Sequence, residues 1–191
     1  SRYSMSTSAS LGELVRRAMA DFIALQDGQV AALEEHYRLL LKWNSGMNLT
    51  TVTEVEEAAV RHYAESLFLG LQISGTSVVD VGSGPGFPGI PIAILRPDWQ
   101  VTLVESNKRK AVFLREASRN LGNVRVVADR GQAVKGEFDW VVSRAVDPAE
   151  VLKLPLAPHF ALLVGAEDAR AIGRGSVILL PWGNNRVAVV L

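Results

Sequence analysis

A glycine-rich segment at residues 78–89 constrains the fold of this chain more than any other part of the sequence. Its residues are Val-Val-Asp-Val-Gly-Ser-Gly-Pro-Gly-Phe-Pro-Gly, an apolar strand followed by a loop with four glycines. Glycine is needed where the backbone takes a positive φ or passes close to a ligand. Because a helix is predicted directly after the loop, the segment has the strand–loop–helix order of an α/β nucleotide-binding unit.

The sequence after residue 76 alternates between strand-like and helix-like patterns. This alternation predicts a mostly parallel sheet with helices on both faces, the Rossmann-like arrangement. The last two apolar runs are joined by Trp182-Gly-Asn-Asn, which predicts an antiparallel hairpin. The predicted strands are 77–81, 100–105, 123–128, 138–143, 159–164, 176–180 and 186–191, and the predicted helices are 90–95 and 108–121.

The predicted organisation has three parts. Residues 1–9 are small and polar, and we expect a disordered or vector-derived tail with Met5 as the native start. Residues 10–75 are expected to form an N-terminal helical region, including a helix over 54–71, and residues 76–191 the Rossmann-like domain.

Composition excludes several classes of protein. A hydrophobic fraction of 48% rules out a disordered chain, and the absence of cysteine rules out disulfides, thiolate nucleophiles and iron–sulfur clusters. The apolar runs are too short to span a bilayer, and no signal-peptide pattern is present. We therefore expect a cytoplasmic protein that contacts no membrane and holds no metal.

The residues around the glycine loop predict a nucleoside cofactor. Glu105 stands at the end of the next strand, where a carboxylate can accept hydrogen bonds from a ribose diol. Gly84, Gly86 and the glycine at 89 also match the dinucleotide fingerprint, so an NAD-dependent oxidoreductase is an alternative. Asp80 would repel a pyrophosphate, and the two prolines of the loop remove amide donors. S-adenosylmethionine has a sulfonium, an amine and no phosphate, and therefore fits this loop better.

Several blocks of the sequence, in order, resemble the GidB/RsmG family of bacterial methyltransferases that modify guanine N7 in 16S ribosomal RNA. The most specific is the cofactor loop with its Phe-Pro-Gly-Ile-Pro extension, and the resemblance covers roughly residues 33–165. The blocks are Leu40-Leu-Lys-Trp-Asn44, Met47-Asn-Leu-Thr50, Arg61-His62-x-x-x-Ser66, Asp80–Pro91, Val104-Glu-Ser-x-x-Lys108 and Phe138-Asp-x-Val-Val-Ser-Arg-Ala145.

The resemblance implies roles for particular residues. Cofactor contacts would fall on Gly82, Phe87, the pair Gly131 and Gln132, and Arg144. Arg144 follows the fourth predicted strand, would face the cofactor or the incoming RNA, and is also a candidate catalytic residue. Arg61 and His62 lie just before the cofactor domain and are candidate catalytic residues at its rim, although His62 is equally well explained as a structural histidine of its helix.

The chain departs from the family pattern at four places. Glu65 replaces an aspartate, Gln132 replaces a common glutamate, and Val164 stands where the family typically has lysine. The segment from Ala166 to Gly175 has room for only a short helix. These departures bear on the choice of substrate more than on the fold or the cofactor.

The formal net charge of zero conceals an uneven distribution. Residues 96–130 contain 8 basic and 4 acidic side chains, and four of the cations are candidate RNA contacts on or beside one predicted helix. A solvated helix face is the alternative interpretation of such a run. The four candidates are Lys108, Arg109, Lys110 and Arg115. The four tryptophans, Trp43, Trp99, Trp140 and Trp182, are candidates for base stacking, although core packing explains most tryptophans.

The expected reaction needs no acid–base pair. Guanine N7 has an exposed lone pair and loses no proton on methylation, so such an enzyme needs proximity and in-line alignment instead of a general base. The expected partner is 16S ribosomal RNA or the small ribosomal subunit. A non-catalytic module that keeps the cofactor fold is the second alternative, motivated by Val164 and the short segment after it.

Overall fold

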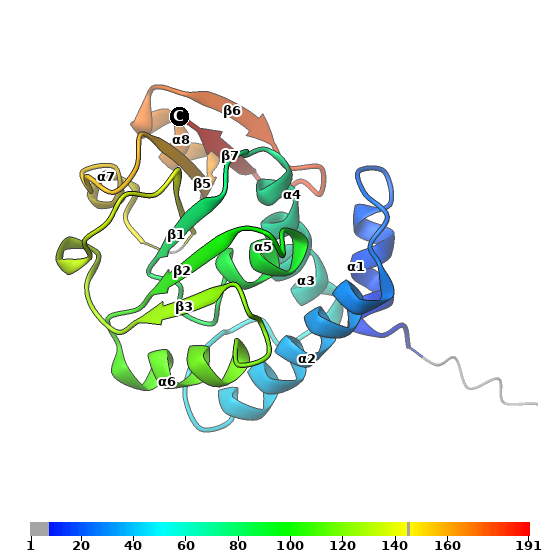
Figure 1. Cartoon of the computed structure of the whole chain (residues 1–191). Coiled ribbons are helices and arrows are strands. Elements are labelled where there is room, and N and C mark those ends of the chain that lie inside the picture. Colours follow the sequence, from blue (N-terminus) through cyan, green and yellow to red (C-terminus); the bar gives the residue numbers. More distant parts are fainter. Residues whose placement is uncertain (1–7, 145) are drawn as a thin grey trace, which may run out of the picture.

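The computed structural model describes residues 8–144 and 146–191, which form N-terminal helices packed on one seven-stranded sheet (Figure 1). Most of the predicted N-terminal tail, residues 1–7, lies outside the described residues. Ser10 marks the first helix, because its Oγ accepts a hydrogen bond from the backbone N of Glu13 at 3.2 Å.

The sheet has the strand order β3-β2-β1-β4-β5-β7-β6. The first five strands in this order pair in parallel, whereas β7 pairs antiparallel with both β5 and β6. The predicted parallel sheet with a C-terminal hairpin is therefore confirmed. The strands are β1 Ser77–Val81, β2 Gln100–Val104, β3 Val124–Val127, β4 Trp140–Ser143, β5 His159–Gly165, β6 Ser176–Leu179 and β7 Arg186–Val190.

Each central strand buries both of its faces. Val78 belongs to the larger hydrophobic cluster, on the face covered by the N-terminal helices with α5 and α6, and its neighbour Val79 belongs to the cluster under α7 and α8. Alternate residues of a strand point to opposite faces, so an almost continuous valine run is required here. These helices are α5 Gly89–Leu95, α6 Lys108–Ala117, α7 Pro148–Val151 and α8 Ala166–Ile172.

The segment before β1 is helical, as predicted, but its last part is not a uniform α-helix. A π-helix over Ala59–Ala64 separates two α-helical pieces, and it contains Arg61 and His62. Such π-helical insertions are rare in proteins, and those that occur are often found at functional sites. The elements are α1 Leu11–Met19, α2 Asp27–Asn44, α3 Val55–Ala58, the π-helix and α4 Glu65–Leu71.

Two departures from the family pattern lie on the face of the sheet that α7 and α8 cover, opposite the N-terminal helices. Val164 is only 5% exposed and packs in the cluster under α7 and α8, so the side chain that stands in place of the family's lysine lies in the core. The short segment after it forms α8, a helix of seven residues that ends at Gly173 in the left-handed conformation.

Candidate functional site

The glycine loop pairs all of its backbone amides within the chain. The amides of Gly82 and Ser83 donate to Val104 O, and that of Gly84 donates to Glu105 Oε1 at 2.9 Å. Further along, the amides of residues 86, 87, 89 and 90 donate to oxygens of the loop or of Asp80, and positions 85, 88 and 91 are prolines without an amide.

This pairing decides what kind of ligand the loop can hold. A pyrophosphate site at a helix N-terminus needs backbone N–H groups that point at the anion. Here the amides before α5 are already used, and the hydrogen-bonding capacity that remains belongs to acceptors. The loop therefore suits a ligand with a cationic or amine-bearing portion better than it suits a dinucleotide.

Asp80, in β1, holds the glycine loop in place through hydrogen bonds. Its Oδ2 accepts hydrogen bonds from Ser83 Oγ and from the amide of Gly89, each at 2.8 Å. The side chain is fully buried, and burial raises the pKa of its carboxyl to about 7. Oδ1 has no hydrogen-bond partner among the described residues. The observed contacts of Asp80 are thus with the loop itself.

Glu105 lies at the end of β2, as predicted, and its carboxylate bridges two backbone segments. Oε1 accepts from Gly84 and Oε2 accepts from the amide of Asn107 at 2.8 Å. Each carboxylate oxygen can accept two hydrogen bonds, so the side chain retains acceptor capacity beyond these two. Glu105 thereby joins the glycine loop to the beginning of α6.

A cavity of about 210 Å³ opens at the carboxyl ends of the parallel strands. It brings together three predicted residues from separate parts of the sequence: Gly82 after β1, and Gly131 and Gln132 in the short helix after β3. The remaining residues that line the cavity were not predicted from the sequence. These lining residues are Val81, Val104, Ser106, Asp129, Arg130, Val146, Glu150, Val151 and Leu154.

The backbone of Gly82 is packed too closely to accept any side chain. Its φ is +69°, and a Cβ added there would lie 2.0 Å from Cγ2 of Val146. Gly84, at φ +58°, differs, because an added Cβ would meet nothing nearer than 3.9 Å. The loop is therefore tight on the Val146 side and open at Gly84, next to the Glu105 carboxylate.

The side chain of Phe87, an expected cofactor contact, is only 2% exposed and lies among other side chains. The His62 ring stacks on it at 4.4 Å and 10°, and the Arg144 guanidinium lies 5.0 Å from its centroid. Tyr63 and His36 pack against it edge-on, each at 5.0 Å. Phe87 is thus the centre of an aromatic cluster that joins the loop to the N-terminal helices.

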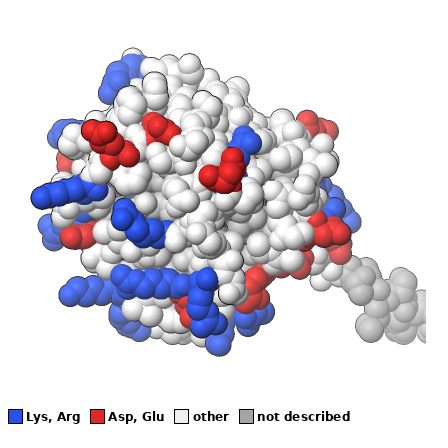
Figure 2. Space-filling model, viewed as in Figure 1, with Lys and Arg blue, Asp and Glu red and all other residues white. Residues whose placement is uncertain are grey.

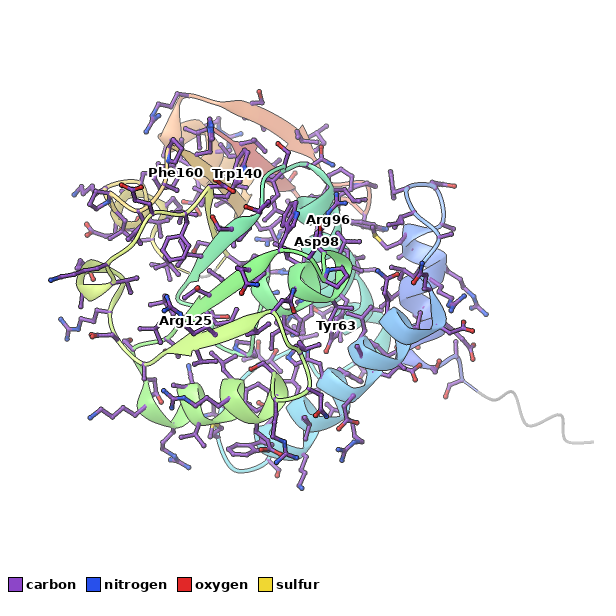
Figure 3. The ribbon with its side chains drawn as sticks, viewed as in Figure 1. Tyr63, Arg96, Asp98, Arg125, Trp140 and Phe160 are labelled. Atoms are coloured by element: carbon purple, nitrogen blue, oxygen red, sulfur yellow. The ribbon has the colours of Figure 1, made fainter. Side chains whose placement is uncertain are left out.

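His36 and Tyr63 tie α2 to the same loop. The carbonyl of Pro85 can only accept, so the ring of His36 donates from Nε2 at 2.8 Å, and Nδ1 accepts from the Tyr63 hydroxyl at 2.9 Å. Tyr63 is fully buried in the interior of the molecule (Figure 3). Burial lowers the pKa of His36 to about 4, so the ring is neutral near pH 7.

Arg144 and His62, both predicted site residues, are in direct contact. Arg144 donates from Nη1 to His62 Nδ1 at 2.9 Å and to the carbonyl of Arg61 at 3.1 Å. His62 Nε2 lies 2.8 Å from Thr50 Oγ1. Burial and the charge of Arg144 lower the pKa of His62 to about 2. His62 is therefore a neutral ring with both nitrogens occupied. Ala145, which follows Arg144, lies outside the described residues.

Thr50 is a site residue that sequence reasoning placed only within a family motif, without a role. Its hydroxyl oxygen also accepts from the amide of Val52 at 3.0 Å. A threonine in a turn-rich linker carries no pattern that would single it out. Its importance follows from the approach of the linker to the π-helix.

A buried ion pair lies beside this group. Glu65 Oε1 accepts from Nη2 of Arg186 at 3.1 Å and from its Nε at 3.3 Å, and the two side chains are 4% and 12% exposed. Burial, together with the charges of Arg61 and Arg186, lowers the pKa of Arg144 to about 10, and the charge of Glu65 opposes this shift. The glutamate that departs from the family's aspartate thus joins α4 to the beginning of β7.

Three of the four candidate RNA contacts lie in the first turn of α6, and Arg115 lies in its last turn. Figure 2 shows Lys and Arg side chains gathered along the part of the surface where α6 lies in Figure 1. Among the described residues, none of the four forms an ion pair. Lys108, Arg109 and Arg115 are exposed, and Lys110 is half-buried.

Neither a metal cluster nor a membrane-spanning helix is present in the described part of the chain. In residues 8–144 and 146–191, no three His, Asp or Glu side chains lie together as metal ligands. No helix in those ranges is long and apolar enough to cross a membrane.

The fold is the Rossmann-like fold of S-adenosylmethionine-dependent methyltransferases. A Plasmodium falciparum structure described as a protein-L-isoaspartate O-methyltransferase with S-adenosyl-L-homocysteine gives a TM-score of 0.54 at 16% identity, covering 96% of this chain and 95% of that one. A SAM-dependent methyltransferase from Aquifex aeolicus gives 0.51 at 17% identity, covering 61% and 81%. At these identities the likeness concerns the fold alone.

The sequence comparison identifies the family. The family model described as GidB, rRNA small subunit methyltransferase G, matches residues 29–160, and the chain belongs to this family. A protein named ribosomal RNA small subunit methyltransferase G from Nitrosomonas europaea is 49% identical over 122 residues, 62% of this chain and 57% of that protein. A protein of the same name from Nitrosospira multiformis is 42% identical over 157 residues, 80% of this chain and 71% of that protein.

Proposed function

We propose that this chain is an S-adenosylmethionine-dependent methyltransferase that acts on guanine N7 of 16S ribosomal RNA. The observation that carries the proposal is the glycine loop with all of its amides paired, beside a cavity at the carboxyl edge of the sheet. Membership of the GidB family supports the ribosomal substrate. The matched segment spans only 57% of the Nitrosomonas protein, so the activity of the whole relative is inferred for this chain.

The cavity fits the adenosine portion of the cofactor. Its volume of about 210 Å³ is below the roughly 300–1,000 Å³ of sites that enclose a whole drug-sized ligand. Gln132 lines it and supplies both an amide donor and an amide acceptor for the edge of adenine. Glu105, with its remaining acceptor capacity, is assigned to the ribose hydroxyls. Gly131 leaves little room for a side chain, since an added Cβ would lie 3.0 Å from both Leu154 and Val81.

The remaining portion of the cofactor is assigned to the loop. Gly82, Gly84 and Gly86 have positive φ values and carry no Cβ to block a ligand. Asp80 does not line the cavity and holds the loop through its contacts with Ser83 and Gly89. Phe87, enclosed among four side chains, acts by holding the loop in place.

The chemistry requires positioning and no proton transfer by the protein. When bound, S-adenosylmethionine supplies an electrophilic methyl group, and guanine N7 supplies a lone pair. His62, which contacts Arg144, is suited to positioning and not to proton transfer, because its ring is neutral and both of its nitrogens are hydrogen-bonded. Arg144 and Arg61 are assigned to holding the cofactor and the RNA at the rim, where alignment provides the rate enhancement.

The RNA is assigned to the cations of α6. Lys108, Arg109, Lys110 and Arg115 have no carboxylate partner in the described ranges, and unpaired surface cations favour phosphate binding. Replacing one phosphate-binding cation by a neutral residue should reduce the slope of log affinity against log salt by about one. A substrate within the small ribosomal subunit implies a cytoplasmic location.

Two measurements test the proposal. Calorimetry should detect binding of S-adenosylmethionine and none of NAD, and the reverse result would favour an oxidoreductase. Labelled methyl transfer should occur to small-subunit RNA that lacks the modification, offered both free and assembled, with the product mapped to a guanine N7. Cofactor binding without transfer to either substrate would favour a non-catalytic binding module.

A further inference from the structure

A second cavity, of about 380 Å³, lies away from the cofactor cavity, between the end of α2 and α6. Its volume falls within the range of sites that bind small organic groups. The loop after α2 forms one side and the first turns of α6 form the other (Figure 1). Its lining residues are Lys42, Trp43, Ser45, Gly46, Met47, Arg109 and Val112.

The walls of this cavity suit a flat apolar ring. The indole of Trp43 is half-buried and packs edge-on against Phe113, a fully buried core residue, with ring centroids 5.7 Å apart. Met47 is also half-buried, and Val112 leaves 50% of its surface exposed. An aromatic face, a thioether and an exposed aliphatic side chain together form a surface on which a planar base can stack.

The charges around the cavity select an anionic partner. Both charged lining residues, Lys42 and Arg109, are cations, and neither has an ion-pair partner among the described residues. Lys108 and Lys110 flank Arg109 on the first turn of α6. An apolar slot bordered by cations is complementary to a nucleotide, whose base is planar and whose phosphate is negative.

The position of the cavity relates it to the proposed reaction. The helix that carries Arg109 and Val112 starts at Lys108, directly after Asn107, whose amide bonds the Glu105 carboxylate. The beginning of α6 thus connects the end of β2, at the cofactor edge, to one wall of this cavity. We propose that the cavity binds one unpaired nucleobase of the RNA substrate, with the adjoining phosphates on Lys42 and Arg109. This inference rests on the proposed function and adds a subsite to it.

Photo-crosslinking of the full chain tests the subsite. The probe is a single-stranded RNA oligonucleotide that carries one 5-iodouridine, and the cross-linked peptide is identified by mass spectrometry. We expect the link at Trp43 or Met47. Annealing the probe to its complement hides the base faces, so it should abolish this link while phosphate-dependent binding persists.

Matched variants at an exposed position give the control. Val112→Glu places a negative charge at the mouth of the cavity and should reduce the cross-link by about tenfold or more, whereas Val112→Thr keeps the shape and should retain it. Lys42→Glu repeats the test from the α2 side. Thermal melting of each variant checks that the fold is unchanged.

The outcomes separate this inference from the proposed function. Equal labelling of Trp43 by single-stranded and duplex probes, or labelling that Val112→Glu and Lys42→Glu leave unchanged, would overturn the base subsite. If methyl transfer to ribosomal RNA continues in that case, the proposed function stands and the cavity has another use, such as a protein partner. Failure of the unaltered chain to bind S-adenosylmethionine would instead contradict the proposed function.

Discussion

The guanidinium Nη1 of Arg144 lies 2.9 Å from Nδ1 of His62, and the arginine must be the donor because a guanidinium has no acceptor. Nδ1 of His62 is therefore unprotonated, and the ring proton resides on Nε2, which donates to Thr50 Oγ1. Thr50, His62 and Arg144 thus form a chain of two hydrogen bonds. A linker threonine orients a histidine of the π-helix, and that histidine orients an arginine at the end of β4.

This chain of hydrogen bonds predicts the effect of Thr50→Val. The variant keeps the shape of the side chain but leaves the Nε2 proton of His62 without an acceptor, which should cost about 1–3 kcal/mol of the free energy of unfolding. Methyl transfer should fall in kcat more than it changes in KM, because Arg144 loses its fixed orientation. Thr50→Ser retains the acceptor and should restore both. A threonine that acts only by packing would give the opposite ranking of the two variants.

The buried titratable groups predict how stability changes with pH. The pKa values of His36 and His62 are lowered to about 4 and about 2, so below their unfolded pKa of 6.5 the unfolded chain binds more protons at both rings. Asp80 has the opposite sign, because its pKa is raised to about 7 and its folded form binds the extra proton above 3.8. Between about pH 4 and 6.5 the net difference for these three groups is one proton. Their contribution to stability should therefore fall by about 1.4 kcal/mol per unit as the pH decreases.

Urea denaturation at several pH values, with two variants, isolates these contributions. Asp80→Asn removes the opposing group, so the dependence should steepen by about 1.4 kcal/mol per pH unit relative to the unaltered chain. His36→Gln removes one ring and should flatten it by a similar amount. Identical slopes in all three proteins would show that these groups do not titrate as assigned.

The contacts of Glu105 predict a graded response to substitution. Glu105→Ala leaves the amides of Gly84 and Asn107 without their acceptor, and we expect a loss of about 1–3 kcal/mol in stability together with weaker cofactor binding. Glu105→Gln keeps one acceptor oxygen and should be the milder change in stability. Calorimetry with S-adenosylmethionine and thermal melting would measure the two effects separately. Unchanged cofactor affinity in both variants would mean that Glu105 serves the loop alone.

The buried pair of Glu65 and Arg186 predicts strong coupling between the N-terminal helices and the hairpin. Removing either partner leaves a charge in the interior, so Glu65→Ala and Arg186→Ala should each cost about 3–5 kcal/mol. The double variant should cost clearly less than the sum, since no charge is left unpaired. A double-mutant cycle by urea denaturation measures this coupling. Additive losses would show that the two side chains stabilise the fold independently.

Local sequence patterns were sufficient for most of the fold. The valine runs, the glycine loop and the Trp182-Gly-Asn-Asn turn predicted the strands to within about two residues, because burial on both faces and turn chemistry are properties of neighbouring residues. The predicted helix over 54–71 was right in extent but missed the π-helix at Ala59–Ala64. That insertion depends on what the helix packs against, and no local pattern records it.

The sequence by itself determined a parallel sheet, a glycine loop unsuited to phosphate and an acid at the end of the second strand. Only the tertiary structure decided that Phe87 is enclosed by His36, His62, Tyr63 and Arg144, and that Thr50 completes the contact of His62. The physical reason is sequence distance. Hydrophobic periodicity is set by neighbours, whereas a hydrogen bond between residues 82 positions apart exists only after the helices have packed on the sheet.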